Sequence, residues 1–366
     1  MNTFEMNNAR KDSDAYGGAI TKHSPVVEVF SAMVNGESLE RFGKKADVAV
    51  NYIKNLGTRA DNGDTSAMVE LNTIRRFVVE TPVMEEMKLL GIFGSYQSVG
   101  FDDTIEREVY THVGEPSREQ ATGGDVVFPV LSKEVYNVPT FTVSGGYAVD
   151  YRRVAAGDMS KENEGLAQVK IDILNHAKLA IVKKIYKAIK EATGVKYMYE
   201  FAGLTKTGVD NVLTNVRRNG RPTVVGDYAI LSQFTPWAGY VGSVNSTTIT
   251  GISEKAMNDI AQNGTLAMYN GAVLAEMENP YNIYKLNAAG DNFETLLPAG
   301  LAFIVPTGVK SPIATYTRGG LTSFTGNDIK TGKVLTRFDI EVGCDVAKGH
   351  EYKIGVIYDT NVGGID

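Results

Sequence analysis

The stretch that decides the fold runs from Asp158 to Thr193 and reads DMSKENEGLAQVKIDILNHAKLAIVKKIYKAIKEAT. Apolar residues recur in it at steps of three and four, which places them on one face of an α-helix. This apolar stripe consists of Leu166, Val169, Ile173, Ala177, Ile181, Ile185 and Ala188. Asp158 or Ser160 can cap the first amides, and Gly194 can adopt the left-handed conformation that ends a helix. At 1.5 Å per residue the helix is about 50 Å long, which predicts an elongated subunit.

The composition limits the possible functions. A chain of 366 residues with 43% hydrophobic content can bury a large core in two or more lobes. Its 37 basic and 43 acidic residues give a net charge of -6, which argues against a surface devoted to gripping nucleic acid or anionic lipid. The single cysteine, Cys344, excludes an internal disulfide framework, and no apolar run is long enough to predict a membrane span. The N-terminal residues do not resemble a secretion signal, so we expect synthesis in the cytoplasm.

The region before residue 100 is predicted to be helical. Residues 1–23 lack apolar periodicity and are expected to form an arm. Helices are expected to begin at Ser24-Pro25, Ser38 and Ser66, the last running to Val79. A separate short helix is expected from Thr81-Pro82 to Gly91.

A long β-hairpin is predicted after Gly100. Apolar and polar residues alternate from Ile105 to Val113, and a return run extends from Val126 to Val143. The return run contains two prolines, which suit an edge strand, and residues 114–124 form a polar tip. Because a two-stranded hairpin is only marginally stable in water, we expect another surface to cover it.

The chain beyond the long helix predicts a small α/β region and then long strands. A helix over residues 208–218, a buried strand from Pro222 to Gly226 and a helix capped by Asp227 alternate in the α/β manner. Further strands are expected near residues 266–269, 272–277 and 301–305, and the C-terminal residues alternate clearly. Turns are expected at Gly319-Gly320 and Lys348-Gly349.

The sequence predicts no catalytic chemistry. The four histidines are scattered without metal-ligand spacing, and Cys344 lies in an alternating strand as expected for a packed thiol. The nearest approach to a phosphate-binding loop, residues 326–334, has one residue too many between its glycines and no hydroxyl where Mg²⁺ requires one. We therefore predict a protein that is not an enzyme, with no catalytic, cofactor-binding or metal-binding residues and no cofactor.

The order of these parts resembles that of the major capsid proteins of tailed double-stranded DNA bacteriophages, whose Hong Kong-type fold encapsulins share. The resemblance covers about residues 65–360. Its most specific pieces are PTVVGD at 222–227, GTLAMYNGAVL at 264–274 before Asn279-Pro280, and LPAGLAFIVP at 297–306.

This resemblance implies an α+β fold with five parts. Residues 1–65 would be the N-terminal arm and its helices, 66–99 a helical segment leading to the peripheral domain, and 100–157 an extended β-hairpin loop. Residues 158–204 and 296–366 would form the peripheral domain, with its long spine helix and long antiparallel strands. Residues 205–295 would form the axial α/β domain.

The resemblance also implies a function. The chain is expected to self-assemble, as hexamers and pentamers, into an icosahedral shell that encloses viral double-stranded DNA without sequence-specific binding. Scaffolding, portal and decoration proteins are the expected partners, no membrane is involved, and the expected location is the virion capsid after assembly in the bacterial host cytoplasm. The hairpin would lie over a neighbouring subunit. The expected inter-subunit contact residues are Arg107, Glu108, Glu115, Arg118, Glu119, Arg152 and Arg153.

Two alternatives remain open at the level of sequence. An encapsulin-like bacterial compartment shell protein would have the same fold and enclose enzyme cargo instead of a genome. A soluble α/β enzyme or carbohydrate-binding protein belongs to a different class, and the scattered histidines count against it.

Deletion of residues 114–124 tests the predicted hairpin. We expect the shortened subunit to fold but to close shells poorly, because the tip would contact a neighbour and not its own chain. Circular dichroism of the subunit and electron microscopy of the assembled material measure the two properties. Loss of subunit folding would mean that the hairpin packs within its own chain.

Overall fold

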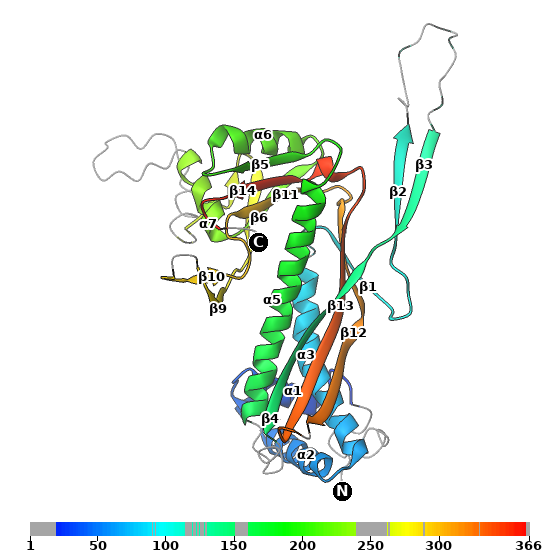
Figure 1. Ribbon diagram of the computed structural model, residues 1–366, viewed down its shortest axis with the longest axis vertical. Coiled ribbons are helices and arrows are strands. Elements are labelled where there is room, and N and C mark those ends of the chain that lie inside the picture. The colour runs from blue at the N-terminus through cyan, green and yellow to red at the C-terminus, as the bar shows by residue number, and fades with distance from the viewer. Residues whose placement is uncertain are drawn as a thin grey trace, which may run out of the picture.

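The computed structural model is elongated, with one long helix, α5 (Ser160–Lys190), connecting two regions of β-sheet (Figure 1). The structure describes residues 20–89, 91, 93–113, 119, 122, 124, 128, 130–150, 160–238, 262, 264–287, 290–328 and 330–363. A four-stranded sheet lies along α5, and a six-stranded sheet packs near its C-terminal end. Helices and mixed sheets together give the α+β class expected from the sequence.

Helix α5 confirms the prediction made from its periodicity. All members of the apolar stripe are buried except Ala188, which is partly buried against the same core. Helix α5 packs on strands β4 (Thr140–Asp150) and β13 (Lys333–Val346) and on helix α3 (Thr65–Leu89). The expected arm before residue 20 and the expected cap Asp158 lie outside the described residues.

The four-stranded sheet has the order β1-β12-β13-β4. Strand β1 (Ser95–Val99) runs parallel to β12 (Ile313–Asp328), and β13 (Lys333–Val346) pairs antiparallel with both β12 and β4 (Thr140–Asp150). The expected turn at Gly319-Gly320 is wrong: these glycines form an irregularity inside β12, where the register with β13 shifts. A bulge lets the strand bend and continue without leaving the sheet.

The N-terminal helices are α1 (Pro25–Val34), the short 3₁₀ helix η2 (Leu39–Phe42), α2 (Lys44–Asp61) and α3 (Thr65–Leu89). Two expectations are corrected here. Ser38 caps η2 only, because Gly43 adopts a positive φ of 53° before α2 begins. The cap of α3 is Asp64, whose carboxylate accepts from the amides of Ser66 and Ala67.

Helix α3 also passes through Pro82 without ending, so the separate short helix expected there is wrong. Proline removes one helical hydrogen bond and usually interrupts a helix. Val78 and Val79 before it and Val83 and Met87 after it are all buried in the main core. Packing on both sides of the proline therefore holds the helix together where local propensity would break it.

A buried ion pair joins α3 to α5. The Arg75 guanidinium contacts the Glu162 carboxylate, and both side chains are almost fully buried. Arg75 also donates to Asn72 Oδ1 at 3.0 Å, and the Thr325 hydroxyl of β12 donates to the same oxygen at 2.7 Å. The pair and its hydrogen bonds thus connect two helices and the sheet.

The six-stranded sheet has the order β5-β14-β11-β6-β8-β7. Its strands are β5 (Tyr197–Phe201), β6 (Arg221–Gly226), β7 (Met268–Tyr269), β8 (Ala272–Glu276), β11 (Leu301–Thr307) and β14 (Gly355–Asp359). Helix α6 (Lys206–Arg217) covers one face, and the other face joins the core around α5. Because both faces are buried, β11 is a continuous apolar run.

Polar side chains cap the N-termini of the two helices of this region. The Thr205 hydroxyl accepts from the Gly208 amide at the start of α6. Asp227 accepts from the Ala229 amide at the start of α7 (Tyr228–Leu231), as predicted. Helix α7 is short, and the chain continues from it as the 3₁₀ turns η4 (Ser232–Phe234) and η5 (Pro236–Ala238). The last turn of this kind, η6 (Glu351–Lys353), precedes β14.

The sheets divide the chain differently from the five expected parts. Strand β4 was expected within the hairpin region 100–157 but belongs to the four-stranded sheet. Strands β5, β11 and β14, from the expected regions 158–204 and 296–366, lie in the six-stranded sheet beside β6 and β8. An alternating pattern indicates a strand but does not identify the sheet that it joins.

Helix α5 approaches β4 closely because two glycines remove side chains between them. A Cβ at Gly145 of β4 would lie 2.8 Å from Ile173 Cγ1, and one at Gly165 of α5 would lie 2.9 Å from the Tyr147 ring. Real Cβ atoms essentially never make non-bonded contacts shorter than 3.0 Å. The glycines therefore set the distance between helix and sheet.

We expect Gly145→Ala to lower the free energy of unfolding by about 1–3 kcal/mol, the usual cost of overpacking. The matched control is Gly326→Ala in β12, where an added Cβ meets nothing within 4 Å. Urea unfolding of the dispersed subunit measures both variants. Equal effects at the two positions would refute a tight contact between α5 and β4.

Candidate inter-subunit surface

A two-stranded hairpin projects from the body of the molecule (Figure 1). Strand β2 (Glu106–Val113) pairs antiparallel with β3 (Val130–Asn137), from Glu106 opposite Asn137 to Val113 opposite Val130. The two strands pair only with each other among the described strands. Side chains therefore connect the hairpin to the body, mainly at its base and also at Glu134 of β3, whose Oε1 lies 3.4 Å from Lys348 Nζ.

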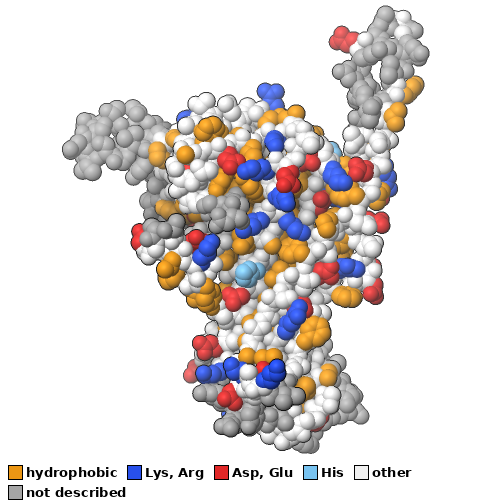
Figure 2. Space-filling view, viewed as in Figure 1, with side chains coloured by type: hydrophobic (Ala, Val, Ile, Leu, Met, Phe, Trp, Pro, Cys, Tyr) orange, Lys and Arg blue, Asp and Glu red, His pale blue; other side chains and the backbone are white. Residues whose placement is uncertain are grey.

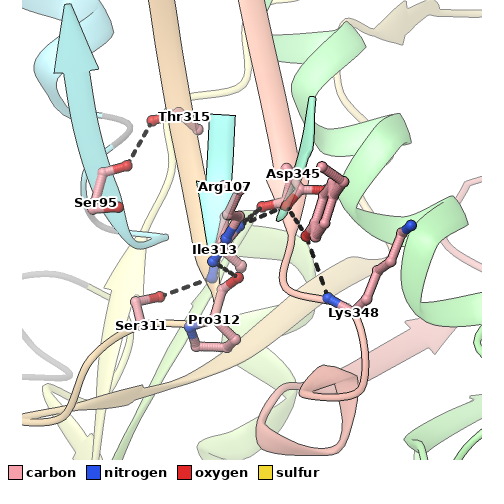
Figure 3. Close-up of polar contacts among 9 residues, drawn as sticks. Ser95, Arg107, Ser311, Pro312, Ile313, Thr315, Asp345 and Lys348 are labelled. Carbon is pink, nitrogen blue, oxygen red and sulfur yellow. Dashed lines mark hydrogen bonds and ion pairs between the residues drawn. The ribbon is translucent and has the colours of Figure 1, made fainter. Parts of the chain in front are cut away.

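Arg107 anchors the base of the hairpin (Figure 3). Its Nη1 donates to Asp345 Oδ2 of β13 at 2.8 Å, and its Nη2 donates to the Pro312 carbonyl at 2.6 Å. The two charged side chains are only 10% and 17% exposed. Because two nitrogens of the planar guanidinium donate to two partly buried acceptors, the contact fixes the orientation of the hairpin and also stabilises it.

Tyr136 completes the anchor from the second strand. Its hydroxyl donates to Asp345 Oδ2 at 2.7 Å, so both strands of the hairpin bind one carboxylate. Burial is the main cause that raises the pKa of Tyr136, and the hydrogen bond to Asp345 is the second. The phenol therefore stays protonated and can act as the donor. Beneath it, Ile105 and Val138 form a small apolar cluster with Tyr316.

The arms beyond the base carry exposed charges, and one ion pair joins the two strands. Lys133 Nζ lies 2.5 Å from Glu108 Oε1, and the Tyr110 hydroxyl donates to the other oxygen at 3.1 Å. The hydrogen bond from Lys133 lowers the pKa of Glu108, so this pair stays charged at neutral pH. Both side chains remain about half exposed.

Apolar side chains lie exposed along the same arms, as Figure 2 also indicates. They are Tyr110, Phe128, Val130, Leu131 and Val135. Isolated two-stranded ribbons are only marginally stable in water. Exposed apolar groups that lie together mark interaction surfaces. The hairpin thus offers an apolar surface that its own described chain does not cover.

The structure describes three of the seven expected contact residues. Arg107 is engaged within its own chain, Glu108 pairs with Lys133, and Glu119 is exposed. The other four expected residues lie outside the described part of the chain: Glu115, Arg118, Arg152 and Arg153.

The sequence prediction missed Asp345 and Tyr136, which orient the hairpin, and the apolar residues on its arms. Asp345 is 238 positions from Arg107, so no local pattern connects the two. The apolar residues were visible as part of the strand pattern, but their exposure was not.

The described residues were also compared with the chemical features expected from the sequence. No group of three or more potential metal ligands occurs among them. Cys344 is buried as predicted, and burial raises the pKa of its thiol to about 12. No described helix is long and apolar enough to cross a membrane.

Comparison with solved structures finds capsid chains at low sequence identity. The virus-like particle from Pyrococcus furiosus is 8% identical, with 76% of this chain and 97% of that chain covered and a TM-score of 0.44. The mature capsid of bacteriophage PhiM1 is 13% identical, covering 73% and 85%, with a TM-score of 0.45. The capsid of the native GTA particle is 12% identical, covering 74% and 89%, with a TM-score of 0.46.

No curated protein matches the sequence. A family model does match, over residues 5–358, and it is described as "SPbeta prophage-derived putative capsid protein YonB". Because the TM-scores lie below 0.5, the assignment rests on this family match, which spans almost the whole chain. The chain therefore belongs to the YonB family of prophage-derived capsid proteins.

Proposed function

We propose that this chain is a major capsid protein and that many copies assemble into an icosahedral shell enclosing packaged double-stranded DNA. The family match over residues 5–358 carries the proposal. The β2–β3 hairpin supports it, because the base is fixed by Arg107 and Asp345 while the apolar arms stay exposed. A surface held in one orientation before contact loses less entropy on binding.

The shell would consist of hexameric and pentameric rings closed by heterologous interfaces, the type that generates rings. In this arrangement the six-stranded sheet would form the axial domain, and α5 with the four-stranded sheet would form the peripheral domain. The hairpin arms would lie on a neighbouring subunit. Glu119 and the four undescribed charged residues, Glu115, Arg118, Arg152 and Arg153, would add polar contacts at its edge.

The proposed role is structural and not enzymatic. A net charge of -6 suits a wall that encloses DNA without gripping it, since a cationic wall would hold phosphates in a strongly salt-dependent way. Scaffolding, portal and decoration proteins would be the partners during assembly in the bacterial cytoplasm. The finished shell would be part of the virion.

The test of this proposal is the state of the protein after expression, alone and with the structural genes that accompany it. We expect closed particles hundreds of Å across in sedimentation and negative-stain microscopy, and nuclease-resistant DNA inside particles from the complete set. A chain that stays monomeric under all these conditions would overturn the proposal. Particles filled with an enzyme in place of DNA would favour a compartment shell.

Arg107→Leu tests the anchor of the hairpin. We expect the subunit to lose about 1.5–3 kcal/mol of stability, because Asp345 loses a charged hydrogen-bond partner in a partly buried site. The hairpin should become sensitive to limited proteolysis, and particle yield should fall because its orientation is no longer fixed.

The control for this variant is Lys133→Leu, which breaks an exposed pair on the arms. It should leave unfolding unchanged, because exposed ion pairs contribute little. If both variants unfold and assemble alike, the base is not the anchor.

A further inference from the structure

A second two-stranded ribbon leaves the molecule on the side opposite the β2–β3 hairpin (Figure 1). It consists of β9 (Tyr281–Leu286) and β10 (Phe293–Thr295), which pair antiparallel and with no other described strand. The register shifts once between Phe293 and Glu294. We call these two strands the β9–β10 ribbon.

The ribbon has a well-defined base. The Asn279 side chain donates to Asp227 Oδ2 at 2.7 Å and to the Leu297 carbonyl at 2.9 Å, and its Oδ1 accepts from the Leu297 amide at 2.7 Å. The Leu296 amide donates to the Pro280 carbonyl at 2.9 Å, directly beside the first ladder pair. These bonds fix the direction in which the ribbon leaves the six-stranded sheet.

Large apolar side chains are exposed on both faces of the ribbon. Tyr284 is 77% exposed and Ile283, its neighbour in β9, is 60% exposed. Since successive strand residues point to opposite faces, both faces are apolar. The remaining members are Tyr281, Leu286 and Phe293, and Figure 2 shows hydrophobic side chains gathered in this region.

The size and composition of this surface indicate a protein partner. Five such side chains expose on the order of 500 Å² in total, whereas scattered single apolar residues are the normal condition of a surface. A stable interface buries about 800 Å² on each partner, so the ribbon would supply most of one side of a contact. Three of the five residues are aromatic, the type enriched at the centres of interfaces.

The charges on the ribbon favour another copy of this chain over nucleic acid. Lys285 pairs with Glu294 at 2.8 Å across the two strands, so the ribbon presents no excess positive charge to phosphates. Copies of a chain with net charge -6 repel one another overall. An apolar ribbon whose ion pair is internal provides attraction between copies without adding to that repulsion.

We propose that the β9–β10 ribbon is a second contact surface between copies of this chain, distinct from the β2–β3 hairpin. Its apolar side chains pack on the next subunit of a ring. The two ribbons lie on opposite sides of the molecule, as a head-to-tail interface requires of surfaces that serve two different neighbours. This inference rests on the proposed shell function.

The first test is the double variant Ile283→Lys with Tyr284→Lys, compared with the conservative variant Ile283→Leu with Tyr284→Phe. We expect the lysine variant to fold like the parent, by circular dichroism and thermal unfolding, and to lose at least about tenfold in particle yield. The conservative variant should assemble like the parent. A lysine variant that assembles normally overturns the inference, and one that fails to fold does so too, because the ribbon would then belong to its own core.

The second test identifies directly which chain packs on the β9–β10 ribbon. Tyr284→Cys creates an accessible thiol in a chain whose single native cysteine, Cys344, is buried. This variant, labelled with a benzophenone maleimide, is assembled with an equal amount of isotope-labelled parent chain and irradiated. Crosslinked peptides that combine both isotope patterns are expected.

The parent protein without the new cysteine gives the background for this test. Crosslinks confined to one isotope pattern, or no crosslinks in assembled particles, overturn the inference while the shell function stands. If the parent chain forms no particles, the proposed function fails together with the inference.

Discussion

The close packing of α5 on β4 constrains the rest of the structure. Gly145 and Gly165 remove side chains at the contact, so that Ile173 and Tyr147 fill the space between helix and sheet. This aligns a helix of 31 residues with strands β4 and β13 of the long sheet. Helices α1 and α2 and the six-stranded sheet then lie toward opposite ends of α5, and its length contributes most of the length of the subunit.

The two projecting ribbons share one design. Each has a base fixed by polar side chains, Arg107 with Asp345 in one and Asn279 with Asp227 in the other. Each then exposes apolar residues along strands that pair with nothing else in the described chain. Each also holds an ion pair across its own two strands, Lys133 with Glu108 in one and Lys285 with Glu294 in the other. Contacts inside the subunit thus set the direction of each ribbon, while its apolar surface is available to neighbours.

Much of the fold could be predicted from sequence because it depends on local periodicity. The stripe of α5, the proline start of α1 and the buried strand β6 are properties of neighbouring residues. The hairpin at β2 was predicted for the same reason, and so was its need for cover. Its anchor was not, since a charged Arg107 on an alternating strand is indistinguishable from a solvated one until Asp345 is placed beside it.

The sequence by itself determined the long periodic segments, such as α5 and β2, and the apolar face of α5, because an apolar spacing of 3.6 or 2 residues identifies a helix or a strand locally. Short strands such as β1 and β5 were not predicted. Only the tertiary structure decided which surface buries each face. Packing carried α3 through Pro82, and pairing with β13 assigned β4 to the long sheet. β11 and β14 joined the six-stranded sheet for the same reason. Partners hundreds of residues apart are chosen by hydrogen bonding and fit in three dimensions, which no local pattern contains.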